Sequence, residues 1–225
     1  GFRSFIKNEP FEMSVFYVAR NLALKKDDCI LDIGANIGHA SIPVCKKLSC
    51  NLIAVEASKE NASLLLRNIK LNNIKAEVLI SALVSPEFKE KYTKLYIRNG
   101  NRGANSLLES WNPSILGDEY EWAPCITLDK FLNNATNSKK IKLIKIDVEG
   151  MEYEVLKGGI NFIKKSKLPI LMEYRFNEST KIKLKKILLM FSKIYNISGI
   201  DEMGKKISFN PEKSYENILF ERKNN

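Results

Sequence analysis

The chain has little histidine and cysteine and no long apolar run, and each shortage excludes a class of protein. Its single histidine, His39, excludes metal sites built on several histidines. Its four cysteines contain no C-x-x-C pair, and we expect all of them to be reduced in a cytoplasmic protein. No stretch of about 18 apolar residues suits a membrane span, and the N-terminus "GFRSFIKNEPFEMS" shows no signal peptide.

Positive charge is in excess, with a formal net charge of +10, but the lysine pairs are spread over the whole chain. Such a charge would suit nucleic acid, an anionic membrane surface or a phosphorylated small molecule. We favour the simpler explanation, which is a solvated, lysine-rich surface. The hydrophobic content of 44% can fill a core, and no repeat or long linker divides the chain. We therefore predict a single domain over residues 1–225.

Apolar runs alternate with amphipathic segments in the first third of the chain. Buried strands are predicted at residues 29–35, 51–57 and 76–84. Helices are predicted over residues 10–24, which lie within an N-terminal extension (1–27), and over residues 38–48. A third helix is predicted to begin after Ser58, which would be its N-cap, and its apolar face consists of Ala62, Leu65, Leu66 and Ile69. The β-α-β-α-β order implies a parallel sheet with right-handed crossovers.

Residues 85–127 interrupt this alternation and predict a β-rich insertion after the third strand, on the substrate side. Trp111 and Trp122 lie in it, and they could either stack on an acceptor ring or pack beneath the insertion. The alternation then resumes. The remaining predicted elements are strands at 141–147 and 168–174, helices from 151 and over 179–193, and two closing strands at 195–200 and 216–222.

The stretch "LDIGANIGHA" joins the first strand to the next helix and predicts a nucleotide site of a particular kind. A dinucleotide fingerprint reads G-x-G-x-x-G, whereas here Asp32 precedes Gly34 and Gly38. Gly34 lets the backbone turn close to a ligand, and Asp32 should put a carboxylate beside the pocket. Glu56 ends the second strand, where an acid accepts ribose hydroxyls. A ligand with a ribose, a cation and no phosphate fits this set, which indicates S-adenosylmethionine.

The strand "LIKIDVEG", residues 143–150, ends in three charged residues, Lys145, Asp147 and Glu149. Their spacing of two puts them on one face of a strand, and buried charges need a partner or a use. Ligands of open α/β sheets bind beyond the carboxyl ends of the strands, so both acids should face a transferred methyl group. Methyl transfer to a hydroxyl needs a proton acceptor, for which either acid, or Lys145 with a pKa lowered by burial, is a candidate. Glu173, at the end of the next strand, could join this cluster and is a further candidate. His39 is interpreted as a helix-start residue.

Two alternatives stay open for this strand end. Asp147, Glu149 and Glu173, which ends the next strand, could bind Mg²⁺ and so lower the pKa of an acceptor hydroxyl; we do not commit to this metal site. Lys145 could instead serve only to neutralise Asp147 in a buried pair.

The chain resembles the FkbM family of methyltransferases over roughly residues 28 to 175. The segments that carry the resemblance are "ILDIGANIGHASI", "VEASKENASLLLRNIKLNN", "SALVS", "ITLDKFL" and "IKLIKIDVEGMEYEVLKGG". The resemblance implies a class I Rossmann-like α/β fold, with a mostly parallel twisted sheet and helices on both faces. It also implies an S-adenosylmethionine-dependent O-methyltransferase. The cofactor positions that it implies are Asp32, Gly34, Ala35, Asn36, Gly38 and Glu56, with Ala57 where the family commonly has proline, and Ser81 and Ala82 flanking the adenine.

The leading prediction is therefore O-methylation of a hydroxyl on a sugar or another small natural product. An RNA or DNA methyltransferase is the first rival, but "DVEG" replaces the N/D-P-P-Y/F motif, and basic and aromatic residues do not interleave. A non-catalytic module that binds S-adenosylmethionine is the second rival.

Overall fold

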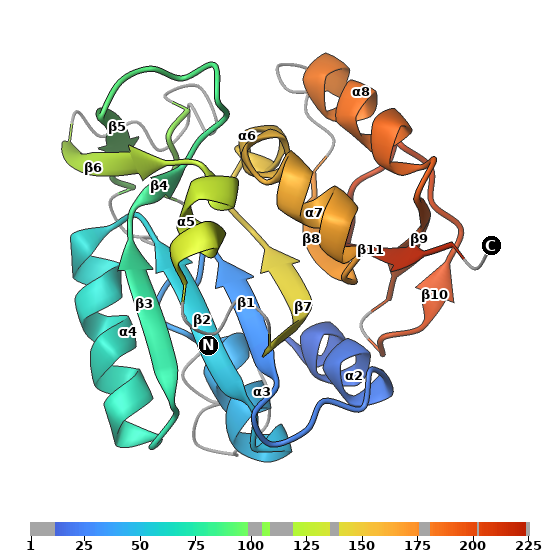
Figure 1. The fold of residues 1–225 in the computed structure, drawn as a ribbon, viewed down its shortest axis with the longest axis horizontal. Helices are drawn as coiled ribbons and strands as arrows, with labels where there is room; N and C mark the ends of the chain where they lie inside the picture. The colour runs from blue at the N-terminus through green and yellow to red at the C-terminus, as the bar shows by residue number, and fades with distance from the viewer. Residues whose placement is uncertain are drawn as a thin grey trace.

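Figure 1 shows the protein as a computed structural model, which describes residues 12–98, 105–108, 119–135, 140–175, 181–201 and 203–223. An eight-stranded sheet crosses the molecule, with helices on both of its faces, and a three-stranded sheet lies beyond one end of it. Within the described ranges, no helix is both long enough and apolar enough to span a bilayer.

The large sheet is mostly parallel, as predicted, with strand order β10-β9-β11-β8-β7-β1-β2-β3. Its parallel strands are β3 (Ala76–Ile80), β2 (Asn51–Glu56), β1 (Cys29–Ile33), β7 (Ile141–Ile146) and β8 (Ile170–Tyr174). The closing strands are β9 (Tyr195–Ile200), β10 (Lys206–Ile207) and β11 (Tyr215–Arg222). β11 is antiparallel to both β8 and β9. The chain extends in opposite directions from β1 and β7, so the ligand-binding switch point lies between these two strands.

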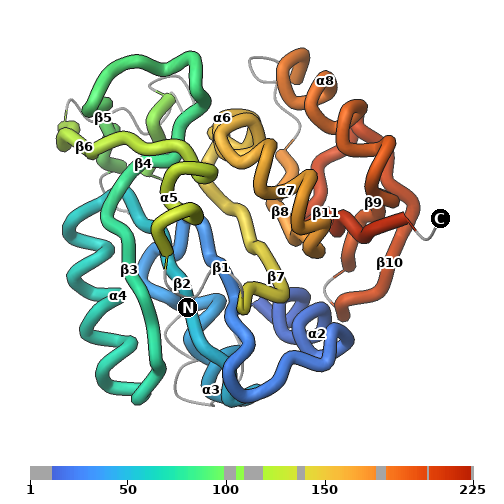
Figure 2. The backbone as a smooth tube through the Cα atoms, viewed as in Figure 1, coloured from blue at the N-terminus to red at the C-terminus, as the bar shows by residue number. Residues whose placement is uncertain are grey.

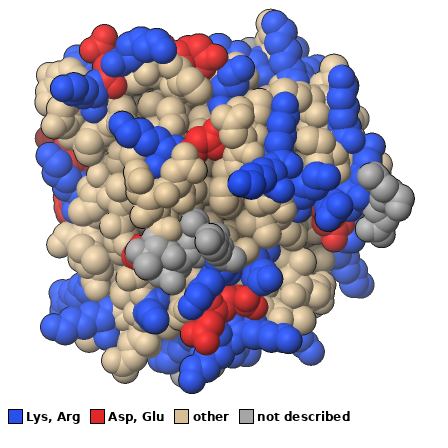
Figure 3. Space-filling model, viewed as in Figure 1, with Lys and Arg blue, Asp and Glu red and all other residues tan. Residues whose placement is uncertain are grey.

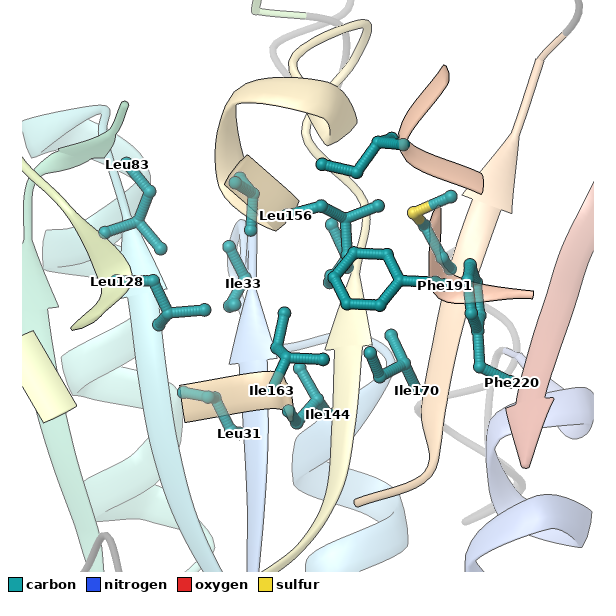
Figure 4. Close-up of a cluster of buried hydrophobic side chains, with 14 of the residues drawn as sticks. Leu31, Ile33, Leu83, Leu128, Ile144, Leu156, Ile163, Ile170, Phe191 and Phe220 are labelled. Carbon is teal, nitrogen blue, oxygen red and sulfur yellow. The ribbon is translucent and has the colours of Figure 1, made fainter. Parts of the chain in front are cut away.

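The helices form two layers, one on each face of the sheet. They are α2 (Met13–Asn21), α3 (Ser41–Leu48), α4 (Lys59–Leu71), α5 (Leu128–Asn134), α6 (Glu152–Gly158), α7 (Ile160–Ser166) and α8 (Lys181–Phe191). Successive strand residues alternate between the layers. Leu31 and Ile33 of β1 point toward the α5–α8 layer (Figure 4), whereas Ile30 packs with α2, α3 and α4.

The N-terminal helix α2 is packed into the domain. Ser14 of α2 is buried and its Oγ lies 3.1 Å from Nδ2 of Asn217 in β11, so segments far apart in the chain meet here (Figure 2).

Ser58 caps α4 as predicted, because its Oγ accepts a hydrogen bond from the Asn61 amide at 3.4 Å. The predicted apolar stripe of this helix is wrong at Leu66, which is 47% exposed, whereas Leu65 is fully buried. Consecutive helical residues lie about 100° apart around the axis, so Leu66 falls at the edge of the stripe.

The predicted strand over 76–84 is two strands. β3 ends at Ile80, and β4 (Ala82–Leu83) joins β6 (Tyr120–Ile126) and β5 (Tyr92–Tyr96) in the small sheet. Ser81 sits at the break, where its Oγ donates to the Pro124 carbonyl at 2.7 Å. The insertion is thus β-rich, as predicted. Trp122 on β6 is 52% exposed and does not pack beneath it, and Trp111 lies outside the described residues.

Candidate functional site

A cavity of about 1080 Å³ lies at the carboxyl ends of β1, β2, β7 and β8. Small-molecule pockets are typically about 300–1,000 Å³, so the volume of this one lies just above that range. Six of the nine predicted cofactor residues line it, namely Gly34, Asn36, Glu56, Ala57, Ser81 and Ala82. Asp32, Ala35 and Gly38 are buried and are not among the lining residues. The acids Asp147, Glu149 and Glu173 line it as well.

The β1–α3 loop forms one wall, and two glycines shape it. Gly34 has φ +80, and a Cβ there would lie 1.7 Å from the Asp147 carbonyl oxygen. Gly38 has φ +83, and a Cβ there would lie 2.4 Å from Cδ1 of Ile42. Gly34 is therefore required by the backbone after β7, and Gly38 by the packing of the loop on α3.

Glu56 is held firmly at the cavity wall. Its carboxylate accepts hydrogen bonds from the amides of Asn36 and Ser58, both at 2.8 Å. Burial raises its pKa, and these backbone donors offset only part of that effect. Two donors from different loops leave the carboxylate little freedom, so it is suitably fixed to receive ribose hydroxyls.

The expected position of Asp32 beside the cavity is wrong. The side chain is fully buried on the α2–α4 face of β1, and neither carboxylate oxygen has a hydrogen-bond partner in the described part of the chain. Burial raises its pKa, against the charge of Lys145, whose Nζ lies 3.6 Å from Oδ1. Asp32 can influence the site through Lys145 rather than by facing a ligand.

Lys145 is 1% exposed and stands among three carboxylates. Its Nζ lies 3.3 Å from Oδ2 of Asp147, 3.6 Å from Oδ1 of Asp32 and 4.0 Å from Oε2 of Glu12. Burial lowers the pKa of Lys145, but the three acids together raise it well above its ordinary value. The expectation of a lowered pKa is therefore wrong, and Lys145 stays protonated. The alternative of a buried pair with Asp147 is the one that the geometry supports.

Glu12 is a site residue that sequence analysis missed. It lines the cavity beside His39, whose Nε2 lies 3.1 Å from Oε1 of Glu12. Burial raises the pKa of Glu12, but Lys145 and His39 lower it by more. His39 also lines the cavity, so it is more than a helix-start residue. Nothing local in the sequence pairs these two residues, because they are brought together by the packing of α2.

The acids after β7 lie on a turn rather than on the strand. β7 ends at Ile146, and Glu149 has φ +49. The alternation of side chains along a strand therefore does not determine the position of Glu149. The Glu152 carboxylate holds the turn by accepting hydrogen bonds from the amides of Gly150 at 3.2 Å and Val148 at 3.4 Å. Burial raises the pKa of Glu152 to about 7.

Asp147, Glu149 and Glu173 meet, with one oxygen of each within 4.8 Å of the others. Arg175, also missed by sequence analysis, donates to Oε1 of Glu173 from Nε at 2.8 Å and from Nη2 at 2.7 Å. Burial and then the charge of Asp147 raise the pKa of Glu173 to about 9, despite Arg175. Three carboxylates are also suitable ligands for Mg²⁺, although Arg175 already engages one oxygen of Glu173.

The raised pKa of Glu173 predicts that stability falls as the pH rises. An ordinary glutamate loses its proton near pH 4.5, whereas folded Glu173 holds it to about 9. Between these values the folded state binds the extra proton, so the free energy of unfolding decreases with increasing pH. Glu173→Gln cannot titrate, and its Tm should depend less on pH than that of the wild type. Equal pH dependence in thermal unfolding of the two proteins would contradict the raised pKa.

Comparison with known proteins agrees with this geometry. The methyltransferase FkbM domain family matches residues 32–215. No curated protein sequence matches the chain. The crystal structure of methyltransferase FkbM from Methylobacillus flagellatus KT is 16% identical with a TM-score of 0.56, over 92% of this chain and 47% of that one. This chain thus spans about half the length of that relative.

A second solved structure shares the fold. It is a candidate S-adenosylmethionine-dependent methyltransferase from Methanococcus maripaludis, which is 10% identical with a TM-score of 0.51, over 96% of this chain and 86% of that one. At these identities, both structures show a common fold alone.

Proposed function

The chain belongs to the FkbM family of S-adenosylmethionine-dependent methyltransferases, and we propose that it methylates a hydroxyl of a small acceptor such as a sugar. One observation carries the proposal. Glu56, a fixed acid suited to bind ribose hydroxyls, lines the same cavity as Asp147 and Glu149, which lie at the switch point between β1 and β7. We further propose that residues 1–225 form one catalytic domain, since α2 brings Glu12 to the cavity.

The lining suits this cofactor better than a dinucleotide. Glu56 would receive the ribose hydroxyls, the loop at Gly34 and Asn36 would lie along the cofactor, and Ser81 and Ala82 would flank the adenine. Among the described residues that line the cavity, Arg175 is the one Lys or Arg, and it sits with the acid cluster rather than near Glu56. A pyrophosphate would have no cation there. The bound cofactor supplies an electrophilic methyl group on its sulfonium.

Either Asp147 or Glu149 is proposed to take the single proton that leaves the acceptor hydroxyl. A hydroxyl is a poor nucleophile until its proton leaves, and a carboxylate within hydrogen-bond reach can accept it. The side chain of Asp147 is 26% exposed, so it can face the acceptor, and its ion pair with Lys145 fixes its orientation. Protonated Lys145 holds the carboxylate in place and is the positioning residue in this proposal.

The charge of the cavity bears on the acceptor. The cavity is lined by the acids Glu12, Glu56, Asp147, Glu149 and Glu216, although the chain as a whole is basic. Glu173 also lines it but does not add to this charge, because its raised pKa of about 9 keeps it protonated at neutral pH. Lys and Arg are instead spread over the outer surface (Figure 3). An acidic cavity repels phosphates, which supports a neutral or cationic hydroxylated acceptor over RNA or DNA.

Methyl transfer from cofactor labelled in its methyl group tests the proposal. The enzyme is incubated with a library of sugars, other polyols and short RNAs, and labelled products are analysed by mass spectrometry and NMR. The proposal expects an O-methyl group on a non-phosphorylated compound. Transfer to RNA would favour the nucleic-acid rival, and cofactor binding without any transfer would favour a non-catalytic module.

Replacing Glu56 by alanine should weaken binding of S-adenosylmethionine about 10- to 100-fold, because hydrogen bonds to a charged group contribute about 1.5–3 kcal/mol. Isothermal titration calorimetry measures the change. Asp129→Ala is the matched control, since the Asp129 carboxylate also accepts from backbone amides, those of Asn161 and Phe162, outside the cavity. If Glu56→Ala binds as tightly as the control, Glu56 does not hold the ribose.

A further inference from the structure

We infer that Ser106, in the insertion, is a positioning residue that holds the Glu149 turn against the acceptor. The inference rests on the proposed function, because it takes Glu149 as an acid that faces the acceptor. It adds a physical link between the insertion and the chemistry, through a residue that does not line the cavity.

The segment that carries Ser106 is attached to the small sheet. Tyr96 and Ser106 form an isolated antiparallel bridge, in which the Tyr96 amide donates to the Ser106 carbonyl at 2.9 Å. The Arg98 amide donates to Oδ1 of Asn105 at 2.9 Å. These bonds anchor the segment to the end of β5, so its position follows that of the small sheet.

Ser106 faces away from the cavity between two residues that line it. Asn105 and Leu107 are lining residues, whereas Ser106 is 1% exposed. Its Oγ donates to the Glu149 carbonyl at 2.7 Å and accepts from the Leu108 amide at 3.1 Å. One side chain therefore connects the wall at Asn105 and Leu107 to the turn that carries Glu149.

The Glu149 turn needs such support. Glu149 has φ +49, a left-handed conformation that is unfavourable for a residue with a Cβ. The Glu152 carboxylate holds the neighbouring amides, those of Val148 and Gly150, and Ser106 holds the carbonyl of Glu149 itself. Without the hydroxyl, that carbonyl loses a short bond, and the turn can relax and move the Glu149 carboxylate relative to the acceptor.

Ser106→Ala should lower kcat about 10-fold or more on the acceptor found in the methyl-transfer screen, because small displacements of catalytic groups have large rate effects. The Kd for S-adenosylmethionine should stay within about 2-fold, since the cofactor contacts lie elsewhere. Ser106→Thr keeps the hydroxyl and should recover much of the rate. Ser192→Ala is the matched control, because Ser192 Oγ donates to the Leu189 carbonyl at the same 2.7 Å, far along the chain at the end of α8.

Hydrogen–deuterium exchange of residues 147–151 gives a second readout that requires no acceptor. Ser106→Ala should speed exchange in this turn, and Ser192→Ala should not. If Ser106→Ala exchanges faster but keeps the wild-type kcat, the role of Ser106 is structural alone, and the inference is overturned. The inference is also overturned if the variant shows both wild-type exchange and wild-type kcat. If the wild type methylates nothing in the screen, the proposed function fails first, and the inference fails with it irrespective of the exchange result.

Discussion

Lys145→Met is expected to lower the free energy of unfolding by about 3–5 kcal/mol, the range for removing one partner of a buried ion pair. Lys145 neutralises Asp32, which is fully buried and has no hydrogen-bond partner among the described residues, as well as Asp147. Methionine fills the space but leaves the carboxylates without a cation. Urea unfolding followed by circular dichroism measures the loss.

Two further variants make this expectation specific. Lys157→Met removes an ion pair with Glu87 at the surface, 3.6 Å long, and should cost about 0–1 kcal/mol. Adding Asp32→Asn to Lys145→Met removes one buried carboxylate that has lost its cation. The double variant should recover part of the lost free energy of unfolding. A loss below about 1 kcal/mol in Lys145→Met would mean that these acids are neutralised in another way.

Asp147→Asn and Glu149→Gln should each lower kcat by about 10²- to 10⁴-fold if the replaced acid is the proton acceptor. Both changes keep the shape of the side chain, and both variants should still bind S-adenosylmethionine. Steady-state kinetics with the identified acceptor, together with calorimetry, separates the two effects. Asp129→Asn, outside the cavity, should retain the wild-type rate.

A bound Mg²⁺ would produce a different pattern. Both acid variants would lose the metal together, and EDTA would abolish the activity of the wild type. Wild-type turnover by both acid variants would show that neither acid serves the chemistry.

Sequence analysis predicted the cavity-lining residues Gly34, Asn36 and Glu56 but not Glu12 and Arg175, which also line the cavity. Gly34, Asn36 and Glu56 lie in segments where a local pattern, a buried strand followed by a glycine turn, determines the geometry. Glu12 and Arg175 were missed because no local pattern marks them. They reach the cavity only through the packing of α2 and the end of β8, which are contacts between segments distant in the chain.

The errors in sequence analysis have a common physical origin. Periodicity correctly placed Lys145 on a buried face, but it could not show that three acids converge on its ammonium group and so raise its pKa. Periodicity also predicted that Glu149 lies on the same strand face as Lys145, although the strand ends at Ile146. Ser81 is similar: the apolar run continues through it, while hydrogen bonding passes to a different sheet.

The most direct test of the account is a calorimetric titration of the wild-type protein with S-adenosylmethionine and, separately, with NAD. The account predicts saturable binding of S-adenosylmethionine that is weakened by Glu56→Ala, because Glu56 receives a ribose. The described residues that line the cavity near Glu56 include no Lys or Arg to bind a phosphate. The account therefore predicts no binding of NAD. Binding of NAD without binding of S-adenosylmethionine would contradict the account.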